Sequence, residues 1–369
     1  MTAVNPCYLD HNASTPLRPG AASALVAALA DCGNPSSVHG QGRAARRRLD
    51  AAREQVAALA GARAEQIVFT SGGTEANNLA LRGCNRRRVL VSAIEHDSVL
   101  RAVDDSLIVP VGADGIVDLD ALSELLDGEG PASVVSIMLA NNETGIVQPV
   151  AEAAALARSR GALLHCDAIQ TPGRIALDFT ALGVDMLSLS AHKLGGPKGV
   201  GALIVADRVD LRPILRGGGQ ERGRRAGTEN VPGIAGFGAA AAEAVADLVM
   251  TGTIARLRDA LEARIAAEIP TARIVGQDRA RLPNTTCLAL PGIPAETQVM
   301  ALDLDGIAVS AGSACSSGKV RSSHVLRAMH LPPDIAGAAI RVSLGSVNTQ
   351  SDIDRFLAAY ARLAARAAA

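Results

Sequence analysis

The chain contains very few lysines. Three of its 36 basic residues are lysines, Lys193, Lys198 and Lys319, and the others are arginines. Arginine stays protonated in proteins, whereas a desolvated lysine can lose its proton and act as an amine nucleophile. Because arginine serves nearly everywhere that only a positive charge is needed, we expect the remaining lysines to include one with a chemical role.

Aromatic residues and paired cysteines are also scarce. The chain has no Trp, two Tyr and four Phe, so a flat cofactor would need another flat side chain, such as histidine, to stack on. The six cysteines lie at positions 7, 32, 84, 166, 287 and 315, with no close pair among them. This spacing excludes a C-x-x-C zinc or redox motif, so we expect free thiols in a reducing cytosol and no metal site.

Positively and negatively charged residues nearly balance, and the net charge is -1. This balance argues against nucleic acid or an acidic membrane surface as the main partner. The N-terminal segment MTAVNPCYLD has no basic region followed by an apolar one, so we find no secretory signal and expect a cytoplasmic protein. The apolar stretch AGFGAAAAEAVADLVM is interrupted by Glu243 and Asp247 and is too short for a membrane span, so we expect none.

Short apolar runs rich in β-branched residues alternate with alanine-rich helical patterns over the first 250 residues. This alternation is typical of an α/β fold with a mostly parallel sheet and crossover helices. The predicted strands are 66–70, 88–93, 133–140, 162–168, 185–191 and 201–206. The predicted helices are 75–82, 119–127, 150–160 and 231–248.

Beyond residue 250 the pattern becomes α+β. It predicts helices at 254–268, 296–303 and 351–367 and strands at 272–276, 285–292, 307–312 and 339–345. A chain of 369 residues that is 48% hydrophobic can bury one large core and a smaller second one. We therefore predict a large domain over 14–250 and a small α+β domain made of 1–13 and 251–369.

Polar and reactive residues follow the predicted strands. In an open α/β sheet, ligands bind at the carboxyl ends of the strands. Five of the predicted strands lead into the segments SGGTEANN, IEHDSV, NNETG, DAIQ and HKLGGPKG. We expect these segments to meet at one edge of the sheet and to form the functional site.

The segment SGGT offers a place for an anion. Gly72 and Gly73 let the backbone approach a ligand closely, and Thr74 lies where a helix begins, with free N–H groups and a positive dipole end. An ordinary strand-to-helix turn capped by threonine would have the same sequence. This segment alone does not decide between the two.

Lys193 lies at the end of a predicted strand beside a glycine-rich turn, in SAHKLGGPKG. Burial there would lower the pKa of its amine and allow it to condense with a carbonyl group. A lysine in this position can also be a plain surface charge. Ser190 and His192, on the same turn, could complete a phosphate site.

Asp167 follows an apolar strand, in HCDAIQ. A carboxylate that is partly buried at the edge of the sheet needs a partner, and a protonated pyridine nitrogen would be one. Alternatively, Asp167 caps a helix or lies on the surface. Gln170, three residues on, could reach a ring hydroxyl. His96, in IEHDSV, could stack on a cofactor ring or could simply be a hydrogen-bonded histidine.

Cys315 lies in the segment SAGSACSSGK, where its neighbours from Ser310 to Gly318 are Ser, Ala or Gly. Residues this small do not give a cysteine the packing contacts that a structural thiol usually has. We therefore predict a flexible loop, in which the thiol is either incidental or a nucleophile that has to move.

Eleven segments, taken together, resemble one known family. They are YLDHNAST, NPSSVHGQGR, FTSGGTEANN, EHDSV, NNETGIVQP, DAIQ, SAHKLGGPKGVGAL, GGGQERGRRAGTEN, SAGSACSSG, SHVLRAM and IRVSLGSVNT. In this order, from about residue 8 to 350, they resemble the cysteine desulfurases of the NifS type. The resemblance implies an α/β pyridoxal-phosphate-dependent transferase fold, like that of aspartate aminotransferase and of class V, with the cysteine loop on the small α+β domain.

The resemblance implies roles around pyridoxal 5'-phosphate. Lys193 matches the lysine that carries the cofactor, His96 the histidine that stacks on its ring and transfers protons, and Asp167 the partner of its pyridine nitrogen. Gln170 matches a contact to the ring oxygen. The phosphate-binding positions match Gly73, Thr74, Ser190, His192 and, from the second subunit of a homodimer, Thr228.

The resemblance also implies the substrate, L-cysteine, and its product, L-alanine. Asn142 and Arg341 match contacts to the amino-acid substrate, with the guanidinium group binding its carboxylate. Cys315 matches the nucleophile, which would take the substrate's sulfur and carry it as a persulfide to a protein acceptor such as an iron–sulfur scaffold. A thiol that acts in two places requires a loop that moves.

The chain departs from the family after the cysteine loop. Family members often have an acidic residue and a proline before the SHV segment, where this chain has KVRS. Two alternatives share the same fold. One is a selenocysteine lyase, and the other is a true aminotransferase, in which Cys315 would have no catalytic role. The alternative that is not an enzyme is a sulfur-carrier or scaffold module.

Overall fold

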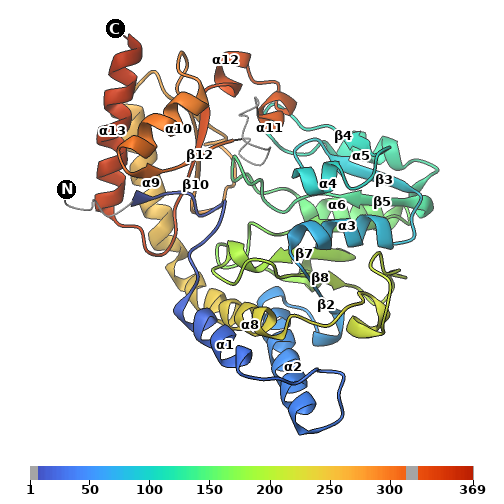
Figure 1. The fold of residues 1–369 in the computed structure, drawn as a ribbon. Helices are drawn as coiled ribbons and strands as arrows, with labels where there is room; N and C mark the ends of the chain where they lie inside the picture. The colour runs from blue at the N-terminus through green and yellow to red at the C-terminus, as the bar shows by residue number, and fades with distance from the viewer. Residues whose placement is uncertain (1–6, 313–322, 369) are drawn as a thin grey trace.

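The computed structural model describes residues 7–312 and 323–368, and its largest sheet has seven strands (Figure 1). Their order is β2-β8-β7-β6-β5-β3-β4. The strands are β2 (Ile67–Thr70), β3 (Arg88–Ser92), β4 (Leu107–Val109), β5 (Ser133–Ser136), β6 (Leu163–Asp167), β7 (Met186–Ser190) and β8 (Gly201–Val205).

The strand directions bring six carboxyl ends to one edge. β4, β3, β5, β6 and β7 are parallel, whereas β8 runs antiparallel to both β7 and β2, so β2 points the same way as β7. The chain passes from β3 outward to β4 and then from β5 through β6 to β7 on the other side. Strand order therefore reverses between β3 and β5, where open α/β sheets have their crevice.

Helices cover both faces of this sheet. They are α1 (Pro19–Leu29), α2 (Gly40–Ala60), α3 (Gly73–Gly83), α4 (Asp97–Leu100), α5 (Leu119–Leu126), α6 (Val150–Ser159), α7 (Phe179–Leu182) and α8 (Val231–Ala246). One face packs Leu49 of α2, Leu122 of α5 and Phe237 of α8, and the other packs Leu79 of α3 and Val99 of α4. Both faces of the sheet are buried, as expected for strands whose sequences are continuous apolar runs.

A smaller assembly packs beside the large sheet, at the upper left of Figure 1. Its four-stranded sheet has the order β12-β13-β10-β9, and a separate pair joins β1 to β11 in parallel. The strands are β1 (Cys7–Tyr8), β9 (Arg273–Val275), β10 (Thr285–Ala289), β11 (Ile307–Ala308), β12 (Ser310–Ala311) and β13 (Ala339–Ser343). The helices are α9 (Thr251–Glu268), α10 (Ala295–Leu304), α11 (His324–Ala328), α12 (Pro333–Ala336) and α13 (Gln350–Ala368).

The predicted α/β fold is confirmed, and the predicted strands and helices lie where the patterns put them. The strand predicted over 133–140 is too long, because β5 ends at Ser136. The predicted elements lack β1, β4, α1, α2 and the short helices α4, α7, α11 and α12. Of these, α2 buries Ala45, Leu49, Ala52 and Val56 at helical spacing. The division into domains stays a prediction, and the pairing of β1 with β11 places residues 7–8 beside the small sheet.

Within the described residues, the helical run Val231–Glu268 is long and apolar enough by composition to cross a membrane. It comprises α8, the 3₁₀ helix Asp247–Met250 and α9. Ile234, Phe237 and Ala241 of α8 are buried in the core, and α8 lies alongside α1 and α2 (Figure 1). The core of the large sheet accounts for this apolar run, and the expectation of no membrane span stays a prediction.

A buried ion pair fixes the segment GGGQERGRR to the large sheet. Arg53 of α2 donates from Nη2 to Glu221 Oε1 (2.7 Å) and from Nη1 to Glu221 Oε2 (2.9 Å), and the guanidinium lies over the Phe69 ring. The Phe69 N–H also donates to Glu221 Oε2 (2.9 Å). Glu221 and Arg222 have φ of 47° and 57°, so these contacts hold two non-glycine residues in the left-handed region.

We expect Arg53→Met to lower the free energy of unfolding by about 3–5 kcal/mol, because it leaves the Glu221 carboxylate buried without its partner. Arg46→Met, on the same helix, is the matched control: Arg46 pairs with Asp50 on the surface, and its loss should cost less than about 1 kcal/mol. Urea unfolding followed by circular dichroism measures both variants. Equal losses in the two would contradict the assignment of Arg53 as a structural anchor.

Candidate functional site

A cavity of about 300 Å³ lies at the carboxyl edge of the large sheet. Its wall comes from the strand ends, the N-terminal segment and β13. The lining residues are Asn12, Ala13, Gly73, Thr74, His96, Ser98, Met138, Ala140, Asn142, Asp167, Ile169, Gln170, Ser190, His192, Lys193, Gly312 and Arg341. Every described residue that the sequence indicated for cofactor or substrate is among them, except Gly72 and Thr228.

Lys193 lies in the 3₁₀ helix Ala191–Lys193, directly after β7. Its Nζ donates to the carbonyl oxygens of Asn12 (2.6 Å) and Ala13 (2.9 Å), which belong to the N-terminal segment. Thr15 Oγ1 in turn donates to the Lys193 carbonyl (3.0 Å). The amine is thus held at the cavity wall by backbone groups.

A chain of hydrogen bonds links Asp167 to His96 through Asn77. Asn77 Nδ2 donates to Asp167 Oδ2 and to Ser98 Oγ, both at 2.8 Å, and Ser98 Oγ lies 2.8 Å from His96 Nδ1. The Ile169 N–H donates to the second Asp167 oxygen (3.0 Å). Asn77 is fully buried, and the sequence motifs did not point to it, since an asparagine inside a helix carries no chemical signal of its own.

His96 is the N-cap of α4, and its Nδ1 accepts the Ser98 N–H (3.1 Å). A neutral imidazole whose Nδ1 accepts a hydrogen bond carries its proton on Nε2. This contact fixes both the orientation and the tautomer of the ring at the cavity.

Gln170 is held on both sides of its amide. Nε2 donates to the Asn12 carbonyl (3.1 Å), and Arg174 donates to the side-chain oxygen and to the main-chain carbonyl of Gln170 (2.9 Å). Burial and, to a smaller extent, the charge of Arg341 lower the pKa of Arg174 to about 9. The second N–H of the Gln170 amide is left for a ligand, because an amide nitrogen has two donors.

A second hollow, of about 490 Å³, lies at the N-terminus of α3. It shares Gly73, Thr74, Ser190 and His192 with the lining of the first cavity, and Lys198 lines it as well. Gly72 has φ of 153°, which favours glycine. A Cβ at Gly73 would lie 2.2 Å from Ile169 Cδ1, so a side chain there would invade the cavity wall.

His192 faces the same hollow. Its pKa is lowered to about 4, first by burial and then by the charges of Lys193 and Lys198. The ring is therefore neutral at physiological pH, and it can donate one N–H to an anion while Lys198 of the same hollow supplies positive charge.

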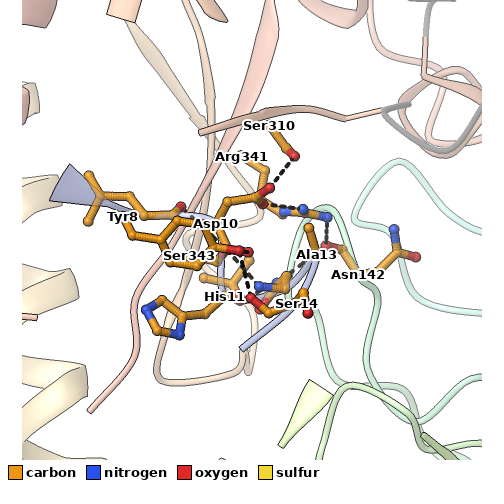
Figure 2. Close-up of polar contacts among 12 residues, drawn as sticks. Tyr8, Asp10, His11, Ala13, Ser14, Asn142, Ser310, Arg341 and Ser343 are labelled. Atoms are coloured by element: carbon orange, nitrogen blue, oxygen red, sulfur yellow. Dashed lines mark hydrogen bonds and ion pairs between the residues drawn. The ribbon is translucent and has the colours of Figure 1, made fainter. Parts of the chain in front are cut away.

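Arg341 reaches the cavity from β13 of the small sheet. Its Nη1 donates to the Asn142 carbonyl (2.9 Å), as Figure 2 shows. Its Nε is buried and has no hydrogen-bond partner among residues 7–312 and 323–368. An unpaired donor on a buried guanidinium is what a site for a carboxylate requires.

Two buried carboxyl groups lie behind the cavity. Glu143 accepts from Ser323 Oγ (2.5 Å), and burial raises its pKa to about 7, against the lowering effects of that bond and of Arg341. Glu95 accepts from Ser92 Oγ and the Met138 N–H, and burial and the charge of Asp167 raise its pKa to about 8. The raised pKa values favour the neutral forms of both acids, and a neutral Glu95 adds no negative charge beside Asp167.

Three predicted features lie away from this cavity or outside the described residues. Thr228 is exposed and does not line the cavity of its own chain. Cys315, with Lys319 of the same segment, falls outside the described residues.

The residues present fit pyridoxal phosphate. Its aldehyde needs an amine, its pyridine nitrogen a carboxylate, and its phosphate a helix N-terminus with hydroxyl groups and positive charge. Lys193, Asp167 and the start of α3 supply these groups around connected hollows.

The family of aminotransferases of class V matches residues 7–356. A cysteine desulfurase of Cereibacter sphaeroides is 47% identical over 365 residues, which cover 95% of this chain and 93% of that protein. The chain belongs to the class-V aminotransferases, among the cysteine desulfurases. An IscS-like cysteine desulfurase of Mycobacterium tuberculosis is 40% identical and covers 98% of each chain.

Solved structures of this family share the fold. A NifS-like protein from Rickettsia africae is 36% identical with a TM-score of 0.91, and the match covers 97% of this chain and 99% of that one. A second NifS-like protein is 35% identical with a TM-score of 0.90 over 98% of this chain and all of the other. The desulfurase fold predicted from the sequence motifs is confirmed by these likenesses.

The raised pKa of Glu143 predicts a pH-dependent cost to stability. Between about pH 4.5 and 7 the unfolded chain loses this proton while the folded chain keeps it, so the free energy of unfolding falls as pH rises through that window. Glu143→Gln abolishes the titration. The variant should therefore gain about 2–3 kcal/mol relative to the wild type between pH 5 and 8.

Denaturant unfolding at several pH values measures this difference. Glu124→Gln, at an exposed position of α5, is the control and should follow the wild type at each pH. A constant offset between Glu143→Gln and the wild type across this range would show that Glu143 is ionised throughout.

Proposed function

We propose that this chain is a pyridoxal-phosphate-dependent cysteine desulfurase that converts L-cysteine to L-alanine. One observation carries the proposal: a single cavity brings together the amine of Lys193, the carboxylate of Asp167 and the guanidinium of Arg341. The relatives named cysteine desulfurases, which match nearly the whole chain, support the same reaction.

The cofactor site is assigned from the lining residues. Lys193 would hold the cofactor covalently, Asp167 would pair with its pyridine nitrogen, His96 would contact its ring, and Gln170 would donate to its ring oxygen. The phosphate is assigned to the start of α3 and the adjoining hollow, with Gly73, Thr74, Ser190 and His192.

When bound, pyridoxal phosphate supplies an electron sink that weakens bonds at the α and β carbons of an amino acid. Arg341 and Asn142 bind the carboxylate of L-cysteine and so fix its α carbon relative to Lys193. Nζ of Lys193 moves the α proton, and Nε2 of His96 exchanges a proton with the substrate. The Asn77 contacts to Asp167 and Ser98 keep the carboxylate and the imidazole in place.

Cys315 is the proposed acceptor of the sulfur. Its thiolate attacks the substrate's sulfur, so that an S–S bond forms as the Cβ–S bond breaks. The electron pair of the broken bond stays with the carbon fragment, which leaves as L-alanine after protonation. Cys315 is left as a persulfide, which passes its sulfur to a protein acceptor such as an iron–sulfur scaffold.

A homodimer is part of the proposal. Thr228 of one subunit would complete the phosphate site of the other, which accounts for its exposed position away from the cavity of its own chain. The Arg53–Glu221 pair anchors the segment that leads to Thr228. The cytoplasmic location stays a prediction from the sequence.

Lys193→Ala and Cys315→Ser should fail in different ways. Lys193→Ala should lose the visible absorbance of the bound cofactor together with all activity. Cys315→Ser should keep that absorbance but lose sulfide release by at least about 100-fold, since no thiolate remains to attack the sulfur. Absorbance spectra, a sulfide assay with a thiol reductant and mass spectrometry of Cys315 after L-cysteine measure these effects.

Each rival function predicts another result. A Cys315→Ser variant with unchanged turnover and transfer of the amino group to a keto acid would indicate an aminotransferase. A wild-type protein that never binds the cofactor would indicate a carrier or scaffold. A gain of one sulfur atom on Cys315 is the result that supports the desulfurase.

Hybrid dimers test the position of Thr228. In a dimer of one Lys193→Ala subunit and one Thr228→Ala subunit, a phosphate contact across the interface places both defects in one site and leaves the other intact. Mixing the inactive Lys193→Ala protein with the impaired Thr228→Ala protein should then give hybrid dimers with one intact site, and so about half of the wild-type rate per dimer. If Thr228 acts within its own subunit, the hybrid has one impaired site and one inactive site, so its rate is about half that of the Thr228→Ala dimer.

A further inference from the structure

The Arg341 guanidinium is held by a carboxylate that does not touch the cavity. Arg341 Nη2 donates to Asp10 Oδ1 (2.6 Å), and the two side chains are 5% and 16% exposed. Asp10 is absent from the cavity lining, whereas Arg341 belongs to it. An almost fully buried arginine needs a carboxylate partner, because an unpaired buried charge strongly destabilises the folded protein.

The second oxygen of Asp10 is engaged as well. Ser310 Oγ donates to Asp10 Oδ2 (2.9 Å), and Figure 2 shows the carboxylate between the Ser310 and Arg341 side chains. Ser310 of β12 and Arg341 of β13 are directly opposed in the antiparallel ladder. One carboxylate therefore fixes two cross-strand neighbours at once.

The backbone of Asp10 is fixed too. Asp10 forms a parallel bridge with Ser343 of β13, and the Tyr8 hydroxyl donates to the Asp10 carbonyl (3.1 Å). The carboxylate thus has little freedom to follow Arg341 if the guanidinium turns.

The contacts leave part of the guanidinium for a ligand. A guanidinium group has five N–H donors, of which Asp10 and the Asn142 carbonyl take two. The Nε donor has no partner among the described residues. Fixing Nη2 restricts rotation of the planar group, so the donors left over keep one direction.

We propose that Asp10 is a positioning residue that orients Arg341 for the carboxylate of the amino-acid substrate, with Ser310 as its brace. This inference rests on the proposed function of the cavity and deepens it. Asp10 acts through Arg341 and has no contact with the substrate. Losing it lets the guanidinium turn, so binding of a carboxylate weakens while the chemistry on bound substrate continues.

The test measures steady-state kinetics of the holoenzyme. Asp10→Ala should raise the KM for L-cysteine by about 10- to 100-fold, the range expected for losing a hydrogen bond to a charged group, with kcat within about threefold. Asp10→Asn keeps an acceptor for Arg341 and should recover most of the affinity. An Asp10→Ala enzyme with unchanged KM, or an Asn variant as impaired as the Ala variant, overturns the proposal.

Two competing ligands show which part of the substrate is involved. L-alanine and ethylamine both present an amine, and only L-alanine has a carboxylate. Asp10→Ala should raise the inhibition constant of L-alanine by about the same factor as KM and leave that of ethylamine unchanged. An equal rise for both ligands would mean a general distortion of the cavity and would overturn the proposal.

A double-mutant cycle separates this inference from the proposed function. In an Arg341→Ala background, adding Asp10→Ala should change KM by less than about twofold, because the residue through which Asp10 acts is gone. Full additivity overturns the role of Asp10. An Arg341→Ala enzyme with normal KM would instead refute the assignment of Arg341 to the substrate.

Glu262→Ala is the matched control for stability. Glu262 accepts from Arg281 Nη1 (2.8 Å) and Nη2 (2.7 Å) and from Thr286 Oγ1 (2.7 Å), so it too joins an arginine to a hydroxyl group, away from the cavity lining. It should lower stability and leave KM unchanged. If Asp10→Ala does not fold, Ser310→Ala carries the test, with an expected rise in KM of about 2- to 10-fold and an unchanged KM as the contrary result.

Discussion

The two hydrogen bonds from the Lys193 amine to the carbonyl oxygens of Asn12 and Ala13 join the parts of the molecule that form the site. Lys193 follows a central strand of the large sheet, whereas Asn12 is bonded to the small sheet through Ser343 and Thr285. The cavity lies where these two assemblies meet. Because the contacts are made to backbone atoms, the position of the amine depends on the path of the N-terminal segment and not on one side chain.

The charged groups around the cavity are compensated locally. Asp167 is held by Asn77 and Arg341 by Asp10, while Glu95 and Glu143 have raised pKa values that favour their neutral forms. Buried charges without such partners would destabilise the fold. The arrangement leaves the cavity with one carboxylate and one guanidinium at defined places, which suits a zwitterionic amino acid on a charged cofactor.

Part of this site could be predicted from the sequence, and the reason is local. Asp167 ends an apolar strand, and Lys193 and His96 each come shortly after one, so the rule for strand ends is enough to predict that they lie together. Asp10 could not be found this way, because it meets Arg341 across 331 residues and lies beyond the end of β1, where it makes only an isolated bridge to Ser343. The role of Asn77 was not predicted, because an asparagine within a helix carries no chemical signal and its two partners, Asp167 and Ser98, belong to other elements. The proposed role of Thr228 depends on a second subunit, and Cys315 falls outside the described residues.

Lys193 is the amine that we assign to the cofactor, and the presence of only two other lysines, Lys198 and Lys319, makes this assignment easy to test. Borohydride reduction of the wild-type protein with pyridoxal phosphate, followed by proteolysis and mass spectrometry, identifies the modified lysine. We expect a pyridoxyl group on the peptide that contains Lys193 and on no other. A label on Lys198 or Lys319, or no label at all, would contradict it.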